Sequence, residues 1–143
     1  MESNKELSSQ FIAYYSKFTN KELSLLSFER VFGGASRETF RILVEDETGS
    51  EEKLILRRTQ ESSLIETSQS TEYLAYSAYQ GTSVPVPAMI DINEDEAALG
   101  APFMLMQQLE GVAASPFTPD AYSPHEEELG QQFWSILGEI AKK

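Results

Sequence analysis

Residues 31–42, VFGGASRETFRI, place two adjacent glycines between two segments with strand character. A loop of this kind either closes a tight hairpin or lets backbone amides approach a phosphate, because glycine has no Cβ to keep a ligand away. The stretch matches neither the G-x-x-x-x-G-K-[ST] nor the G-x-G-x-x-G phosphate-binding pattern. By itself it therefore favours a hairpin turn, and its neighbours in the sequence must decide between the two interpretations.

The segments around the loop predict an α+β fold. Residues 38–47 alternate, with Phe40, Ile42 and Val44 on one face of a strand and Arg41 and Leu43 on the other. Three strands with short connections favour an antiparallel meander. From hydrophobic periodicity, glycines and prolines we expect, in chain order, helix 4–18, strands 25–32, 38–47 and 53–59, helix 62–80, strands within 88–95 and 101–111, and helix 124–141.

Local signals set the ends of the predicted helices. Asn4 is the expected N-cap of the first helix, and Gly81 is well placed to stop the second. The last helix is expected to start at Pro124, followed by three glutamates in its first turn. A sheet with one packed helix, plus helices at both ends of the chain, is the architecture that follows.

Composition excludes several functions. The chain has 143 residues, a net charge of −12 and no cysteine, which disfavours nucleic-acid binding and excludes disulfides and thiolate metal sites. The sequence has neither a secretory signal pattern nor an apolar run long enough for a membrane helix, so we expect a cytoplasmic protein without a membrane partner.

The basic residues are concentrated near the glycine loop. Six of the eleven lysines and arginines lie between residues 30 and 58, and none lies between residues 59 and 141. Among them, Arg57 follows Ile55 on the same face of its predicted strand. Glu72 is the polar residue on an otherwise apolar half-helix with Leu74, and it would need a partner if buried; Arg57 is the nearest candidate in this topology. A structural salt bridge explains this pair as well as a phosphate site does.

Taken together, these segments resemble the N-terminal lobe of the protein-kinase-like fold, and most closely the aminoglycoside phosphotransferase and choline kinase-like family. The resemblance covers residues 28–111 and rests on GGASRETFR, LILRR, GTSVPVP and LGAPFMLMQQLEG in this order. It implies a kinase-like N-lobe over residues 1–111, comprising the helix 4–18 and the sheet and helix of 25–111. Residues 112–143 would form a linker and a helix that lead toward an absent C-lobe.

The resemblance also implies ATP as the ligand and a role for each matching residue. The loop residues would cover the phosphates, Arg57 would contact them and pair with Glu72, Ile55 would pack on adenine, Met106 would be the gatekeeper, and the hinge backbone would bind the adenine edge. The implied ATP-binding residues are Gly33, Gly34, Ser36, Ile55, Arg57, Glu72, Met106, Gln107 and Leu109. Arg57 stands where the family usually has lysine, and this keeps the charge but alters its reach.

The catalytic half of the family's pattern is missing from the sequence. The catalytic Asp, the Asn and the metal-binding Asp belong to the C-lobe, and no HGD motif occurs here. We therefore assign no catalytic and no metal-binding residue, and Mg²⁺ would be held mainly by the absent lobe. His125 is expected to be exposed, and the acidic residues 91–96 are expected to form a solvated turn without the spacing of a calcium loop.

Two functions follow as expectations, and a stable α+β domain without a ligand remains as the third interpretation. The chain is either the ATP-binding lobe of a small-molecule phosphotransferase, not competent alone and with an acceptor that the sequence cannot name, or a non-catalytic kinase-like module that self-associates or recruits a partner. In the second case an apolar patch would be exposed, to which we expect the following residues to contribute: Phe103, Met104, Phe117, Phe133 and Trp134.

Overall fold

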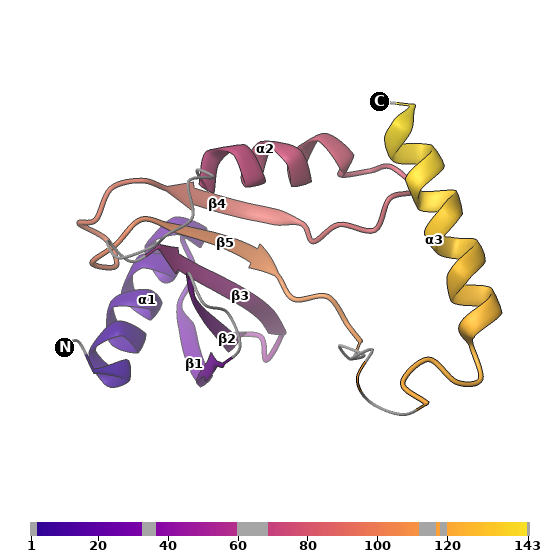
Figure 1. Ribbon diagram of the computed structural model, residues 1–143. Coiled ribbons are helices and arrows are strands. Elements are labelled where there is room, and N and C mark those ends of the chain that lie inside the picture. Colours follow the sequence, from indigo (N-terminus) through magenta and orange to yellow (C-terminus); the bar gives the residue numbers. More distant parts are fainter. Residues whose placement is uncertain (1–2, 33–36, 60–68, 112–116, 118–119, 143) are drawn as a thin grey trace.

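The computed structural model describes residues 3–32, 37–59, 69–111, 117 and 120–142. These residues form five strands and three helices (Figure 1). In chain order they are α1 (Asn4–Thr19), β1 (Leu23–Val31), β2 (Arg37–Asp46), β3 (Glu51–Thr59), α2 (Gln69–Tyr79), β4 (Met89–Asn93), β5 (Phe103–Gln107) and α3 (Glu126–Ala141). The predicted α+β architecture is confirmed.

The five strands form one antiparallel sheet in the order β1-β2-β3-β5-β4. The first three strands are the predicted meander. Its second turn is closed by Asp46, whose side chain accepts hydrogen bonds from the amides of Thr48 (2.9 Å) and Ser50 (3.1 Å), while Gly49 adopts a φ of +80°. The last strand, β5, lies between β3 and β4. The end of the predicted lobe is therefore next to β3, the middle strand of the sheet.

Helix α1 supplies the side chains that fill the core. Leu7, Phe11 and Tyr15 recur every four residues, so they share one face of the helix, and all three are buried. Ser3, not Asn4, is the N-cap, because its side chain accepts the amide of Glu6. The prediction of Asn4 was one residue late, since Ser3 offers the same kind of acceptor one position earlier. The helix ends at Asn20 in the left-handed conformation.

The two faces of the sheet differ in chemistry because successive side chains of a strand alternate. The face toward α1 carries the buried residues Phe40, Ile42, Val44, Leu54 and Leu56, as the alternation predicted for residues 40–44. The opposite face is mixed, because Arg37, Thr39 and Arg57 share it with the apolar side chains of Ile55 and Met106.

Helix α2 lies over β4 and β5 (Figure 1). Within it, Gln69 is buried and donates to the carbonyl of Pro102 (3.2 Å) and to the hydroxyl of Thr59. Gly81 has a φ of +75°, which suits the predicted helix stop. Residues 60–68, which include the predicted start of this helix, lie outside the described ranges. The predicted apolar half-helix is wrong at Leu74, whose surface is 67% exposed, because α1 rather than α2 fills the core.

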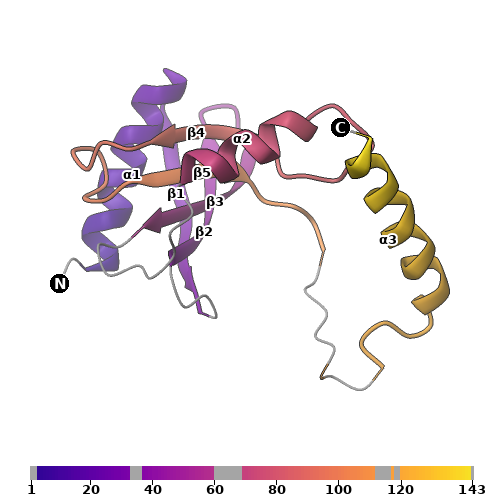
Figure 2. The same ribbon diagram turned by 45° about the horizontal axis from the view of Figure 1, so that its top comes forward.

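Helix α3 stands away from the sheet, with its C-terminal end near the loop that follows α2 (Figures 1 and 2). It begins at Glu126 with His125 as the N-cap residue, two residues later than predicted. None of its residues is buried, and its exposed large apolar side chains are Leu129, Phe133, Trp134, Leu137 and Ile140. No helix in the described part of the chain is both long and apolar enough to cross a membrane.

The predicted apolar patch is only partly correct. Phe117, Phe133 and Trp134 are exposed, at 94%, 57% and 71% of their surface. Phe103 and Met104 are fully buried instead. They belong to β5, which has neighbouring strands on both sides. They are therefore buried, although they precede the predicted hinge in the sequence.

Candidate functional site

The glycine loop connects β1 to β2, and the predicted hairpin is confirmed by the antiparallel pairing of its flanks from Val31–Thr39 inward. The predicted phosphate-covering residues Gly33, Gly34 and Ser36 lie outside the described residues. Just before them, Phe32 is 85% exposed, and the guanidinium of Arg30 lies 5.7 Å from the centre of its ring. The strand ends near this loop are where the basic residues collect.

Glu72 lies between two arginines on the face of the sheet opposite α1. Its Oε2 is 3.0 Å from a terminal guanidinium nitrogen of Arg57, so the predicted ion pair is present. Its Oε1 is 2.7 Å from a terminal nitrogen of Arg37. One carboxylate thus uses each of its oxygens for a different arginine, and the three groups carry a net charge of +1. The sequence did not single out Arg37.

The strand register explains why the two arginines meet. Thr39 is opposite Arg57, and Arg37 is opposite Thr59, so Arg37 lies two residues from the level of Arg57 and on the same face. The alternation of Phe40 and Ile42 toward the core already placed Arg37 on this face. What the pattern lacked was the position of α2, which brings Glu72 over the strand ends.

A second ion cluster occupies the α1 face at the same end of the sheet. Glu38 lies 3.2 Å from Arg58, its partner across the strands, and 3.4 Å from Arg30. The side chain of Arg58 is only 9% exposed and that of Arg30 is 40% exposed. Two clusters, with four arginines and two glutamates between them, therefore lie on opposite faces of the sheet near the glycine loop. They concentrate positive charge in a chain whose net charge is −12.

The predicted adenine residues are also neighbours. Ile55 on β3 is directly opposite Met106 on β5, and Ile55 lies on the face that carries Arg57. Met106 is 6% exposed and Leu109 is 56% exposed. The amide of Gln107 donates to the carbonyl of Ala88 (2.9 Å), and the amide of Gln108 donates to that of Lys53 (3.0 Å). The amides of Gln107 and Gln108 are therefore already bonded within the fold.

Comparison with known proteins identifies the family of this chain. The sequence pattern of the phosphotransferase enzyme family matches residues 27–142. The chain belongs to this family. The match includes both ion clusters, the β3 and β5 strands and helix α3, so the arginine-rich end of the sheet lies within a phosphotransferase fold.

Two proteins that are similar to this chain are both much longer than it. The crystal structure of a candidate aminoglycoside phosphotransferase from Ralstonia eutropha JMP134 superposes with a TM-score of 0.54 and 25% identity, over 80% of this chain and 32% of that one. Mouse acyl-CoA dehydrogenase family member 10 is 29% identical over 92 residues, which cover 63% of this chain and 8% of that protein. The chain thus spans about a third of the solved phosphotransferase and under a tenth of the mouse protein.

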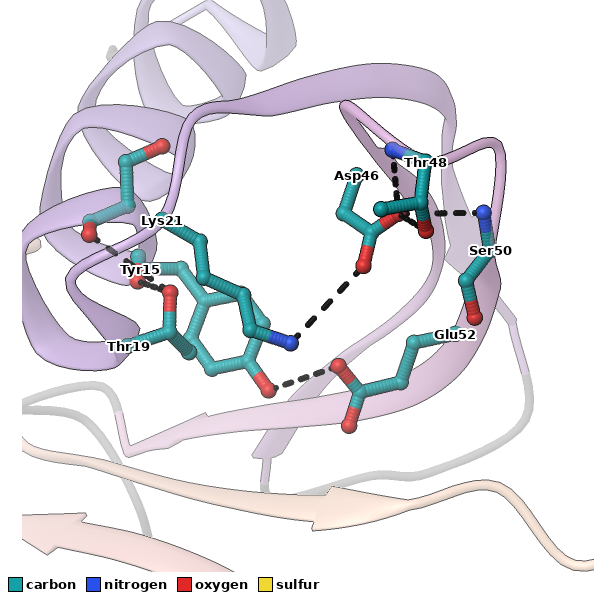
Figure 3. Close-up of polar contacts among 8 residues, drawn as sticks. Tyr15, Thr19, Lys21, Asp46, Thr48, Ser50 and Glu52 are labelled. Atoms are coloured by element: carbon teal, nitrogen blue, oxygen red, sulfur yellow. Dashed lines mark hydrogen bonds and ion pairs between the residues drawn. The ribbon is translucent and has the colours of Figure 1, made fainter.

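A polar pocket of about 260 Å³ lies at the other end of the sheet, beside the β2–β3 turn (Figure 3). Lys21 lies 3.7 Å from Asp46, and the hydroxyl of Tyr15 donates to Glu52 (3.0 Å). Burial, and then the charge of Glu52, raise the pKa of Tyr15 well above its usual range. The hydrogen bonds from Thr48 and Ser50, with a smaller contribution from Lys21, lower the pKa of Asp46. The Tyr15 contact joins α1 to β3 and the Lys21 contact joins the segment after α1 to the end of β2, and we assign both a structural role.

The remaining sequence-based expectations are simple to place. His125 is exposed, with 66% of its side chain accessible, and lies 3.6 Å from Glu128. The acidic segment is a turn in which Asn93 and Asp95 accept backbone amides, but Asp91 is half-buried and accepts the hydroxyl of Tyr14. Among the described residues no group of three or more His, Cys, Asp or Glu could hold a metal ion.

Proposed function

We propose that this chain is the ATP-binding lobe of a small-molecule phosphotransferase and that it has no turnover by itself. The observation that carries the proposal is the Arg37–Glu72–Arg57 cluster, which sits beside the glycine hairpin on the face that also presents Ile55. An accessible cation, Arg57, at one end of this face and apolar side chains along it match the two halves of a nucleotide, which are a polyphosphate and a flat base.

Each residue has a defined task in this proposal. Arg57 neutralises the phosphates, the loop residues 33–36 cover them, and Ile55 packs on adenine with Met106 behind it. The Gln107 carbonyl and the Leu109 amide bind the adenine edge. These groups position ATP and stabilise charge, but they neither activate an acceptor hydroxyl nor replace the Asp and Asn that phosphoryl transfer requires.

The described residues of this lobe contain no group of three or more His, Cys, Asp or Glu that could hold a metal ion by itself, and Mg²⁺ at such sites is held by one or two carboxylates together with the phosphates. In this family the metal and the acceptor belong to a second lobe, which also holds the HGD motif that the sequence lacks. The proposal therefore assigns ATP to this chain, assigns Mg²⁺ mainly to that lobe, and places the activity in the cytoplasm, where ATP is available.

Nuclear magnetic resonance titration with ATP tests the proposal, because half a cleft should bind only weakly. We expect amide shifts at Ile55, Arg57 and Leu109, and no phosphate transfer in a kinase assay. Arg57→Met removes one charged hydrogen bond to phosphate, worth about 1.5–3 kcal/mol, so affinity should fall roughly 10- to 100-fold. Lys21→Met, which removes a cation at the far end of the sheet, should leave affinity unchanged.

Three results would contradict the proposal. Shifts confined to the pocket around Lys21 and Asp46 would place the ligand elsewhere. Equal affinity of wild type and Arg57→Met would remove the assigned phosphate contact. Measurable kinase activity of the purified 143-residue chain would show that the catalytic groups are present after all.

The exposed face of α3 supports a second candidate, a module that associates with itself or with another protein. Phe133, Leu137 and Ile140 face outward in one stripe, and exposed apolar stripes often mark interaction surfaces. Light scattering should then show a dimer that Leu137→Glu dissociates, whereas Gln131→Glu, a control on the same helix, should not change the mass. A monomer at high concentration would count against self-association.

A further inference from the structure

We infer that Arg37, rather than Arg57, anchors Glu72 and helix α2 to the sheet, and that this leaves Arg57 free to exchange Glu72 for a nucleotide phosphate. The inference deepens the proposed function and rests on it for the exchange step. Arg37 is here a positioning residue, since it acts on the phosphate site through Glu72.

The geometry separates the two arginines. Arg37 contacts Oε1 of Glu72 at 2.7 Å, and Arg57 contacts Oε2 at 3.0 Å. Because each arginine has its own oxygen, neither must move for the other to bind. Loss of the Arg57 contact therefore leaves the Arg37 contact in place, and Glu72 keeps a charged partner at hydrogen-bond distance.

Burial makes the two contacts unequal. The side chain of Arg37 is 3% exposed, whereas that of Arg57 is 28% exposed and that of Glu72 is 26% exposed. A buried guanidinium without its carboxylate has little water to replace it, so breaking the Arg37 pair is costly. Arg57 reaches solvent, so water or an anion can replace Glu72 there. The deep contact is permanent and the shallow one is exchangeable.

Charge counting shows what Arg37 adds. With Arg57 alone, an arriving phosphate and Glu72 would compete for one cation, and binding would leave an uncompensated carboxylate near a polyanion. With Arg37 present, Glu72 stays neutralised after Arg57 turns to the phosphate, so the competition is removed. Of the two arginines that contact Glu72, Arg57 is the one that solvent and an anion can reach.

Hydrogen exchange of the ligand-free chain tests the anchor without any nucleotide. Protection of the α2 amides, residues 69–79, is compared with that of β2 in wild type, Arg37→Met and Arg57→Met. We expect Arg37→Met to lower α2 protection about tenfold or more relative to β2, because the helix opens locally. Arg57→Met should change it less than about threefold, and Lys21→Met should not change it.

A second variant covers the case in which Arg37→Met does not fold. Arg37→Lys keeps the cation but offers a point charge without the fork geometry, so α2 protection should lie between wild type and Arg37→Met, or below wild type if Arg37→Met is unfolded. If Arg57→Met loosens α2 or unfolds the chain as much as Arg37→Met does, the assignment is wrong. If Arg37→Lys is indistinguishable from wild type and Arg37→Met folds with normal α2 protection, it is also wrong.

Titration with ATP separates this inference from the proposed function. Arg37→Met should weaken ATP binding, although Arg37 is not placed against the nucleotide, because Glu72 then loses its second cation and competes for Arg57. Arg37→Lys, which keeps a cation beside Glu72, should weaken ATP binding less. If wild type shows the expected exchange pattern but binds no ATP, the proposed function fails and the anchor stands. If wild type binds ATP through Arg57 while α2 protection ignores Arg37, the anchor fails and the proposed function stands.

Discussion

Replacing Glu72 with alanine is the sharpest test of how the arginine-rich end of the sheet is stabilised. The substitution leaves Arg37 and Arg57 facing each other without the carboxylate that joins them. Breaking a fully buried ion pair by removing one partner costs about 3–5 kcal/mol, whereas an exposed pair is worth about 0–1 kcal/mol.

The structure places Glu72→Ala between these limits. Arg37 is almost fully buried, but Glu72 and Arg57 are each about a quarter exposed, so water can hydrate part of the cluster. We therefore expect the free energy of unfolding to fall by about 2–3 kcal/mol and the melting temperature to fall by roughly 6–10 °C.

Urea unfolding followed by far-ultraviolet circular dichroism is the suitable assay. The single tryptophan, Trp134, is on the exposed helix α3 and would report the wrong element by fluorescence. The matched control is Glu110→Ala, which removes the exposed partner of Lys53 at 2.9 Å and should not change stability measurably. If Glu72→Ala and Glu110→Ala lose the same small amount, Arg37 does not depend on Glu72 and the reasoning is refuted.

Three further predictions concern the scaffold. Phe11→Ala should lower the free energy of unfolding by about 3–4 kcal/mol, because Phe11 is fully buried where α1 packs on the sheet. The control Phe18→Ala removes a half-exposed ring and should lower it far less. Similar losses from the two substitutions would place the core elsewhere. Tyr14 and Tyr15 have pKa values raised far above the ordinary 10.0, first by burial and then by Asp91 and Glu52 respectively, so the unfolded state loses these protons before the folded state does. These groups should therefore leave stability unchanged below pH 10, and stability should fall as the pH rises above 10. Tyr14→Phe should flatten this slope when urea titrations at pH 9 and pH 11 are compared. Phenolate absorbance that shows all six tyrosines titrating together near pH 10 in the native state would contradict the prediction. Gly49→Ala should destabilise the β2–β3 turn by about 1 kcal/mol, because the φ of Gly49 is +80°. The control Gly138→Ala, which has open space around a new Cβ in α3, should raise the helicity measured by circular dichroism. Equal effects of the two substitutions would show that the backbone conformation at Gly49 is not the cause.

Much of the fold follows from local patterns in the sequence. The alternation of Phe40, Ile42 and Val44 indicated which face of β2 is buried, and the four-residue spacing of Leu7, Phe11 and Tyr15 indicated a helix with one apolar face. These patterns are readable because a strand repeats every two residues and a helix every 3.6 residues, so neighbours in the chain report burial. The pairing of Arg57 with Glu72 also followed, since the order of strand and helix left few partners for an acid on α2.

Other features depend on contacts between distant segments. No local pattern states that α1 rather than α2 fills the core, or that β5 separates β3 from β4 and thereby buries Phe103 and Met104. The same holds for the outward face of α3, because amphipathic spacing indicates an apolar face but does not say what covers it.

The sequence by itself determined the strands, the amphipathic helices, the concentration of arginines near the glycine loop and the resemblance to a phosphotransferase lobe. Only the tertiary structure decided that Glu72 forms ion pairs with two arginines and that Arg37 is the buried one. The physical reason is that the burial of a charge depends on which elements close over it. For Arg37 it depends on where α2 crosses the sheet, and that position is set by the packing of α2 against β4 and β5, two strands that lie later in the chain.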